Sequence, residues 1–351
     1  MYNPNKFLRV SQIKLSEKTI ELVEKAGKIY WENFDGKTWY GRCIFLSWYC
    51  SNATCSFCFR STDKHKHMHA EDSRRSLASV LLEALFCKIF NWRIEFLTGG
   101  YDIIPYDELV EVMKTVSDVY GEKIWLNLGV LNDERLEKCR PYVKGICASM
   151  ETLNPNLHEK VCPKKPIKPY DEMFSKLKGF KKSAAIIVGL GEQLEDIQYL
   201  FDFVEKHELD RITVYALKPV ADTPFTEGPE PDDNLSWIAS LRIRFPKLEI
   251  IAGTNLRRAE EVGYLMKAGA NAITKFPATK QFGTKKAKFV EELIKAEKRD
   301  FVSNLSVLPN IDWDGEIDKL PIKNELKEEM KKKLVLYLKK FQNPKDIDKN
   351  L

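Results

Sequence analysis

Short apolar runs alternate with segments of helical spacing along most of the chain, and this alternation limits the possible folds most strongly. Eight runs have the length and composition of buried strands, over residues 43–49, 93–97, 123–128, 145–150, 184–188, 211–217, 248–252 and 272–273. The intervening helical patterns cover residues 73–91, 106–120, 133–139, 170–179, 194–207, 234–245, 259–268 and 285–298. Strands that alternate with helices indicate parallel βα units. About eight such units predict an α/β fold, a closed (β/α)8 TIM-type barrel rather than an open doubly wound sheet.

Two further segments flank the expected barrel, which spans residues 39–300. Residues 1–38 form an N-terminal helical segment, in which Ser16 caps a helix over 15–33 with Ile20, Leu22, Val23 and Ala26 on its apolar face. Residues 301–351 form a C-terminal extension with a basic amphipathic helix over 324–341. One face of that helix carries Leu326, Met330, Leu334, Tyr337, Leu338 and Phe341. Either this face docks on the barrel, or the helix lies on an anionic membrane.

Composition excludes several classes of protein. With 44% apolar and 11% aromatic residues the chain can bury a large core. Eight cysteines are too few for a small disulfide scaffold, and no apolar run approaches the roughly 18 residues of a membrane span. Without a secretion-signal pattern, we expect a cytoplasmic protein. From Lys323 onward, nine lysines against five acidic residues account for +4 of the net charge of +5, so the rest carries about +1 and no nucleic-acid partner is expected.

Three cysteines follow the first strand run with the spacing C-x4-C-x2-C. Cys50, Cys55 and Cys58 can bring three thiolates to one soft metal centre. An iron–sulfur cluster is one interpretation, zinc with Cys43 as a fourth ligand is a second, and unrelated structural cysteines are a third. Cys43 is expected at the start of the strand, roughly 20 Å from the loop. With three cysteine ligands, a four-iron cluster keeps one iron without a protein ligand.

Other candidate ligand-binding residues follow later strands. In a barrel the carboxyl ends of the strands share one face, so residues at those ends are expected to gather there. Glycines there let a ligand approach the backbone. The simpler interpretation of the glycines is a tight βα turn, and that of the glutamate is a carboxylate exposed to solvent. The candidates are Thr98, Gly99, Gly100, Ser149, Glu151, Val188, Gly189 and Leu217, together with the aromatic Phe57 beside the last cysteine of the loop.

This ordered set resembles the radical S-adenosylmethionine superfamily, and within it the biotin-synthase-like full barrels, over about residues 40–298. The resemblance implies a [4Fe–4S] cluster on Cys50, Cys55 and Cys58, whose open iron chelates the methionine amine and carboxylate of S-adenosylmethionine. The segment Thr98-Gly99-Gly100 would bind the methionyl group and Glu151 the ribose or amine. Phe57, Val188 and its neighbours would flank the adenine, with Ser149, Gly189 and Leu217 in the same cofactor site. A 5′-deoxyadenosyl radical would then abstract hydrogen from the substrate.

Two departures from the resemblance narrow the function. The loop is one residue longer than the usual C-x3-C-x2-C. The segments 125–128 and 183–188 lack the cysteines of biotin synthase's auxiliary cluster, and Thr254 stands where that family has arginine, so sulfur insertion is not expected. Two branches without that cluster are more similar, the archaeal enzyme of iron-guanylylpyridinol cofactor synthesis and the methylornithine synthases. We therefore expect cofactor biosynthesis on a small-molecule substrate, with a low-potential electron donor as partner.

Two alternative functions remain at this point. The first is radical carbon–carbon bond formation on an archaeal membrane lipid, with peripheral membrane contact through the C-terminal helix. The second is a zinc-stabilised barrel that binds a ligand without catalysis.

The remaining histidines and cysteines have simpler interpretations. His65, His67 and His69 would share one face if they lay on a strand, but a polar loop is favoured. Cys87, Cys139, Cys147 and Cys162 are expected to be small buried hydrophobic residues. For Cys147 and Cys162, a position at the barrel mouth is the alternative.

Overall fold

The computed structural model describes residues 13–345 and contains a closed barrel of eight parallel strands. They are β1 (Lys37–Phe45), β2 (Arg93–Thr98), β3 (Ile124–Asn127), β4 (Val143–Glu151), β5 (Lys181–Val188), β6 (Arg211–Ala216), β7 (Glu249–Gly253) and β8 (Ala272–Thr274). Strand β1 pairs with β8 on one edge and with β2 on the other, which closes the ring. The predicted (β/α)8 fold is confirmed. The ends of the two expected terminal segments, residues 1–12 and 346–351, lie outside the described residues.

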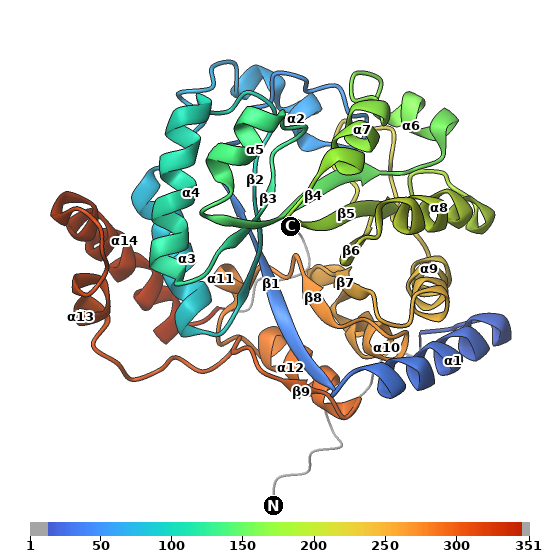
Figure 1. Cartoon of the computed structure of the whole chain (residues 1–351). Helices are drawn as coiled ribbons and strands as arrows, with labels where there is room; N and C mark the ends of the chain where they lie inside the picture. The colour runs from blue at the N-terminus through green and yellow to red at the C-terminus, as the bar shows by residue number, and fades with distance from the viewer. Residues whose placement is uncertain (1–12, 346–351) are drawn as a thin grey trace, which may run out of the picture.

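Helices surround the barrel (Figure 1). The major ones are α3 (Leu77–Ile89), α4 (Tyr106–Tyr120), α5 (Asp133–Cys139), α7 (Lys168–Lys176), α8 (Ile197–His207), α9 (Pro231–Arg244), α10 (Val262–Lys267) and α12 (Lys285–Ala296). Each follows a predicted helical pattern, with shifts at the ends. The short helices α2 (Phe59–Thr62), α6 (Pro155–Val161), α11 (Ala278–Gln281) and α13 (Trp313–Asp318) were not predicted. Their few turns produce too little periodicity to be read from the sequence.

Both faces of the strands are buried, which explains their nearly continuous apolar sequences. One set of strand residues packs beneath the helices. The other set fills the barrel and includes Cys43, Phe96, Trp125, Cys147 and Ala185. The barrel is therefore a packed core whose carboxyl-end mouth is the place for a binding site.

The first strand differs from its prediction. Strand β1 ends at Phe45 instead of spanning 43–49, and it begins at Lys37, where Lys37 and Thr38 also pair with the two-residue strand β9 (Asp300–Phe301). Cys43 therefore lies near the carboxyl end of β1, inside the barrel, and the expected position at the far end of the strand was wrong. The sequence does not indicate this start, because Lys37 and Thr38 are polar and become part of the strand by pairing with β9, far along the chain.

The N-terminal helix α1 (Glu17–Asn33) begins at the predicted cap, where the Ser16 side chain accepts the Thr19 backbone N–H. Its buried face was partly mispredicted. Thr19, Val23, Ala26 and Tyr30 are buried at spacings of three and four residues, whereas Ile20 is 44% exposed. The helix packs on α9 and α10, where the Thr19 hydroxyl lies 3.2 Å from that of Ser236, so a polar residue occupies a place expected for an apolar one.

The C-terminal helix α14 (Asn324–Gln342) packs on α3 at the outside of the barrel (Figure 1). The rings of Tyr337 and Phe341 lie 5.2 and 5.4 Å from the ring of Phe86 on α3. The apolar face proposed for a membrane is thus occupied by the barrel, as the docking interpretation expected. Among residues 13–345, no helix is both long and apolar enough to cross a membrane.

This packing predicts that α14 contributes substantially to stability. Phe341→Ala should lower the free energy of unfolding by about 3–5 kcal/mol, because Phe341 is 4% exposed and its removal leaves a cavity. Leu336→Ala on the same helix is the control, since Leu336 is 61% exposed and its truncation should change stability little. Urea unfolding of the full chain measures both. Equal effects of the two changes would contradict the docked arrangement.

Candidate active site

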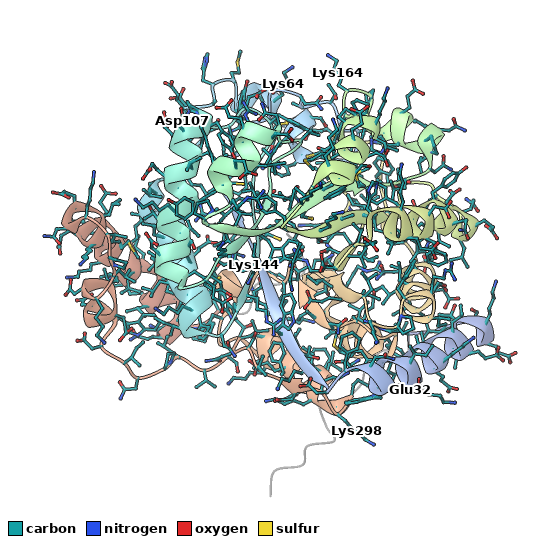
Figure 2. The ribbon with its side chains drawn as sticks, in the orientation of Figure 1. Glu32, Lys64, Asp107, Lys144, Lys164 and Lys298 are labelled. Carbon is teal, nitrogen blue, oxygen red and sulfur yellow. The ribbon has the colours of Figure 1, made fainter. Side chains whose placement is uncertain are left out.

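The carboxyl ends of the strands form one end of the barrel, where α2, α6 and α7 lie in Figure 1. Lys64 and Lys164 mark the same end in Figure 2. Strained backbone gathers here. Five non-glycine residues that follow or end strands have positive φ, namely Ala53, Asp102, Glu151, Asp222 and Lys275. Such conformations persist where the surrounding structure enforces them, and they cluster at functional sites.

The cysteine loop follows β1 and is fixed by backbone hydrogen bonds. The Cys50 sulfur accepts the backbone N–H groups of Ala53 and Tyr101, each at 3.4 Å. The Ser56 N–H donates to the Val161 carbonyl at 2.9 Å, which ties the loop to α6. Cys58 directly precedes α2. The loop is therefore held by the segments that follow β2 and β4, and not by β1 alone.

The donor atoms of this loop fit an iron–sulfur cluster. Cys50, Cys55 and Cys58 form no disulfide bonds and are half-buried. In the part of the chain that the structure describes, no three His, Cys, Asp or Glu side chains are placed to hold one metal ion. A cluster binds each cysteine at a different iron, so its ligands need not meet at one atom. Cys43 does not join them, because its thiol donates to Glu95 inside the barrel at 2.9 Å.

Cys162 lies beside the cysteine loop, as the less favoured interpretation allowed, whereas Cys147 faces the barrel interior. A hydrogen bond from the Cys162 thiol lowers the pKa of Cys55 and raises that of Cys162. Burial raises the pKa of Cys58. Cys162 belongs to an apolar cluster with Leu190 and Leu217, against which Cys55 and Phe57 pack. Three strand ends thus contribute to one apolar wall beside the loop.

The Thr98-Gly99-Gly100 turn contacts the cysteine loop directly. Thr98 ends β2 and pairs with Phe45 of β1 and with Asn127 of β3. A Cβ atom on Gly100 would overlap the Tyr49 carbonyl oxygen and the side chain of Cys50. The absence of a side chain at Gly100 is therefore what lets the second βα turn approach the loop.

A buried ion pair occupies the end of β4. The Lys165 ammonium lies 2.7 Å from the Glu151 carboxylate, and the two side chains are only 6% and 12% exposed. Burial acts to lower the pKa of Lys165, but the Glu151 charge outweighs it, so the pKa lies well above the usual value. The sequence predicts the Glu151 carboxylate at the mouth, either solvated or, as the resemblance implies, in contact with the cofactor, but it predicts no ion pair. Lys165 was missed, because nothing in the proline-rich sequence around it indicates a partner for Glu151.

A buried histidine contacts the backbone of Lys165. The two ring nitrogens of His158 lie 2.8 Å from the Thr152 carbonyl oxygen and 2.6 Å from that of Lys165. His158 is buried on α6, so this bridge joins the end of β4 to the segment that carries Lys165. The fold therefore fixes the backbone from which the Lys165 side chain reaches Glu151.

The turn after β5 is stabilised by a carboxylate from within the turn, that of Glu192. The Glu192 carboxylate accepts the backbone N–H groups of Gly189 and of Leu190, the latter at 2.8 Å. The Leu217 N–H donates to the Val188 carbonyl at 2.9 Å. Gly189 has φ +106°, and a Cβ there would lie 2.8 Å from Pro229 Cδ. The fold thus brings together three of the predicted residues, Val188, Gly189 and Leu217. The role of Glu192 is to stabilise the turn.

Ser149 has a partner that the sequence did not indicate. The Asn127 amide at the end of β3 donates to the Ser149 hydroxyl on β4 at 2.9 Å. The two polar side chains stand next to each other because β3 and β4 are neighbours in the barrel. This polar pair lies between the Thr98-Gly99-Gly100 turn after β2 and Glu151 at the end of β4.

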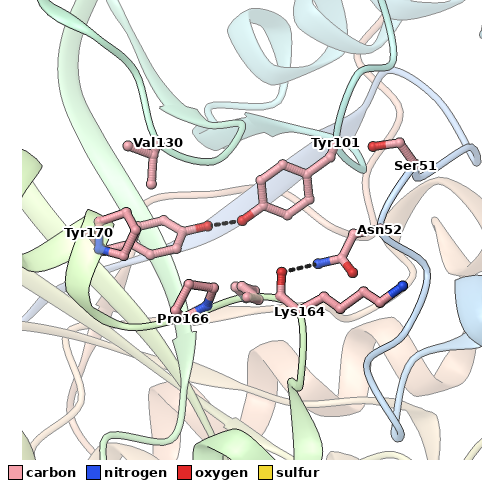
Figure 3. A pocket seen from close by; sticks show the side chains of 9 residues that line it. Ser51, Asn52, Tyr101, Val130, Lys164, Pro166 and Tyr170 are labelled. Atoms are coloured by element: carbon pink, nitrogen blue, oxygen red, sulfur yellow. Dashed lines mark hydrogen bonds between the residues drawn. The ribbon is translucent and has the colours of Figure 1, made fainter.

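A pocket of about 370 Å³ opens beside the cysteine loop (Figure 3). The hydroxyl groups of Tyr101 and Tyr170 are hydrogen-bonded across it, and the Asn52 amide donates to the Lys164 carbonyl at 3.1 Å. Burial raises the pKa of Tyr101, so its hydroxyl stays protonated. The lining residues are Ser51, Asn52, Tyr101, Val130, Lys164, Lys165, Pro166, Pro169 and Tyr170.

The three alternating histidines do not lie on a strand. The segment forms a 3-10 turn over Lys64–Lys66 followed by irregular backbone, and His65 and His69 are exposed. The His67 Nδ1 atom lies 3.3 Å from the Ser73 hydroxyl. The polar-loop interpretation is confirmed.

A parallel barrel with a three-cysteine loop after its first strand and a glycine turn packed on that loop has the architecture of a radical S-adenosylmethionine enzyme. Residues 46–204 match the Radical SAM superfamily, and residues 213–299 match the Biotin and Thiamin Synthesis associated domain. The chain belongs to the radical SAM superfamily and is an enzyme, with a [4Fe–4S] cluster and S-adenosylmethionine as its cofactors. The alternative of a non-catalytic zinc barrel was therefore wrong.

Several archaeal proteins are similar over most of the chain. An uncharacterized protein of Methanocaldococcus jannaschii is 32% identical over 310 residues, 87% of this chain and 86% of the relative. The 3-methylornithine synthase of Methanosarcina acetivorans is 27% identical over 271 residues, 74% of this chain and 75% of that enzyme.

Two solved structures share the fold. Methylornithine synthase has a TM-score of 0.63 at 22% identity, covering 76% of this chain and 80% of that chain. The FeFe-hydrogenase maturase HydG from Carboxydothermus hydrogenoformans has a TM-score of 0.62 at 18% identity, with 94% and 85% covered.

The contact between Gly100 and Cys50 generates a prediction. Gly100→Ala should prevent the cysteine loop from reaching its position, and the iron and sulfide content after anaerobic reconstitution should fall by more than half. Gly263→Ala is the matched control, because a Cβ there meets no atom closer than 3.6 Å. Full cluster content in Gly100→Ala would show that the loop does not depend on this contact.

Proposed function

We propose that Cys50, Cys55 and Cys58 hold the cluster and that the enzyme cleaves S-adenosylmethionine reductively to act on a small-molecule substrate. The observation that carries this proposal is the anchoring of the cysteine loop on the glycine turn after β2. The Cys50 sulfur accepts the Tyr101 N–H, and Gly100 packs against the Cys50 side chain. The loop and the turn that the resemblance assigns to the cluster and the methionyl group are therefore one structural unit.

The ion pair at the end of β4 suits the charged end of S-adenosylmethionine. Glu151 can accept hydrogen bonds from the methionyl amine, and Lys165 can donate to the methionyl carboxylate. The two opposite charges are 2.7 Å apart and their side chains are shielded from water, so the pair forms a dipole that complements the opposite charges of a zwitterion. The backbone of Thr98-Gly99-Gly100 offers polar groups to the same part of the cofactor.

The adenine part has an apolar wall available. Phe57 and Leu217 lie in one cluster with Cys55, and the Leu217 backbone is hydrogen-bonded to Val188. The Ser149 hydroxyl and the turn at Gly189 supply polar groups at the edge of this wall. When bound, the cluster and S-adenosylmethionine supply an electron transfer and a 5′-deoxyadenosyl radical that abstracts hydrogen from substrate. The apolar wall with Phe57 and Leu217 would keep water away from the bound cofactors.

We propose that the substrate is a small molecule in cofactor biosynthesis, with an [Fe]-hydrogenase-type cofactor as the specific candidate and a low-potential protein as electron donor. The widened cysteine loop and the archaeal relatives support this branch. The relation to 3-methylornithine synthases supports a second candidate, a rearrangement of an amino acid such as lysine. The alternative function on a membrane lipid is less well supported, because the apolar residues of α14 that would contact the membrane, Met330, Leu334 and Phe341, are buried in the protein.

Anaerobic reconstitution tests the cluster assignment. The full chain should take up about four irons and four sulfides, and after reduction with dithionite it should form 5′-deoxyadenosine from S-adenosylmethionine. Single changes of Cys50, Cys55 or Cys58 to Ala should abolish the cluster, whereas Cys87→Ala, a buried cysteine on α3, should retain it. Zinc uptake without iron would overturn the proposal. A several-fold rise in 5′-deoxyadenosine on addition of lysine would favour the rearrangement.

The ion pair gives a second test. Either single change would leave a buried charge unpaired, at a cost of about 3–5 kcal/mol, so both residues are changed together in Glu151→Gln/Lys165→Met. This variant should fold but bind S-adenosylmethionine at least tenfold more weakly, as measured by equilibrium dialysis on the reconstituted protein. Lys168→Met is the control, because Lys168 begins α7 and its side chain is 85% exposed. Unchanged affinity in the double variant would remove the pair from the cofactor site.

A further inference from the structure

Lys275 stands at the carboxyl end of β8 in a conformation that lysine rarely adopts. Its φ is +66°, and such a backbone costs roughly 1–3 kcal/mol and persists only where the surrounding structure enforces it. The ammonium lies 4.8 Å from the ring centroid of Phe45 and 5.0 Å from that of Tyr215. Lys275 is exposed at the mouth, and its ammonium lies beside these two rings.

The two rings place the ammonium on the inner side of the barrel. Phe45 ends β1 and Tyr215 lies on β6, and strands β7 and β8 separate these two in the sheet. A group that touches both rings must therefore lie within the circle of strands. The Tyr215 hydroxyl donates to Glu95 inside the barrel at 3.0 Å, which fixes the direction of this ring.

The ammonium has no anionic partner in the described part of the chain. Within residues 13–345, no carboxylate oxygen lies within 4.0 Å of it, and it makes only the two ring contacts. Glu95, deeper in the barrel, is already satisfied. One of its oxygens accepts from Thr213 and Tyr215, and the other accepts from Cys43 and Thr274.

The side chain of Phe45 connects this cation to the cysteine loop. The Arg60 guanidinium packs over the same ring at 5.5 Å and donates to the Ser47 carbonyl at 2.9 Å. Arg60 lies on α2, directly after Cys58. A ligand group held at Lys275 therefore lies close to the loop that is proposed to hold the cluster.

We propose that Lys275 binds an anionic group of the substrate, a carboxylate or a phosphate, at the mouth of the barrel. This inference rests on the proposed function, because it assigns the substrate of that site. The ammonium is positioned by the two aromatic rings, Lys275 is exposed at the mouth, and no carboxylate among residues 13–345 pairs with it, so it is available to an anionic ligand. The substrate class is thus an organic acid, amino acid or phosphorylated compound, anchored across the mouth from the Glu151–Lys165 pair.

Competitive labelling of lysine amines tests this assignment. The reconstituted full chain is treated anaerobically with trace acetic anhydride, alone or with inorganic phosphate, malonate or S-adenosylmethionine. Mass spectrometry then gives the acetylation rate of each lysine. Phosphate or malonate should slow the reaction of Lys275 at least threefold and leave exposed Lys280 unchanged. The more effective probe identifies the anion as phosphate or carboxylate.

Two variants separate binding from structure. With the more effective probe in calorimetry, Lys275→Arg should retain binding and Lys275→Gln should weaken it at least tenfold. Unchanged labelling of Lys275 with both anions would overturn the proposal, and so would equal protection by S-adenosylmethionine alone, which would make Lys275 a cofactor contact. Lys275→Gln with a lower melting temperature but intact anion binding would show that Lys275 only balances the charge of Glu95.

The proposed function is tested separately in the same preparation. Iron content and 5′-deoxyadenosine formation by the unaltered chain report on the cluster, and lysine labelling does not depend on either. Protection of Lys275 without 5′-deoxyadenosine would overturn the proposed function and leave the anion site. The reverse result would overturn the anion site alone.

Discussion

The pairing of β1 with both β8 and β2 is the constraint on which the rest of the structure depends, because it closes the barrel and fixes where the cysteine loop begins. The register between β1 and β2 shifts at Glu95, which is skipped in the pairing. A bulge of this kind re-aims side chains. As a result Glu95 and Phe96, two consecutive residues, both face the barrel interior. One irregularity therefore places the buried carboxylate beneath the mouth.

The site manages its charges in three different ways. Glu95 is surrounded by hydroxyl and thiol donors of β1, β6 and β8. Glu151 is neutralised by Lys165, whose backbone carbonyl is bridged by His158. Lys275 is held only by aromatic rings. Lys275 is exposed at the mouth and its charge attracts an opposite charge, so this difference marks where the protein leaves an interaction for a ligand.

Much of the fold could be predicted because the strands and helices of a parallel barrel alternate, and each type of element has its own pattern of apolar residues in the sequence. All eight strands and the long helices follow local patterns, and the C-x4-C-x2-C loop needs no tertiary information. The mistakes lie where long-range pairing overrides local composition, as at the start of β1 and on the buried face of α1. The assignments of Phe57, Thr98, Ser149, Val188 and Leu217 to a cofactor remain predictions, although the fold places all of them at one end of the barrel.

The sequence by itself determined the barrel class, the cysteine loop and the glycine turn, since these depend on residue types at short spacings. Only the tertiary structure decided which distant residues meet there. Lys165 reaches Glu151 from the segment after α6, and Lys275 reaches Phe45 and Tyr215 across the mouth. A single lysine has no local signature. Its role follows from the strand order, which brings together side chains that lie far apart along the chain.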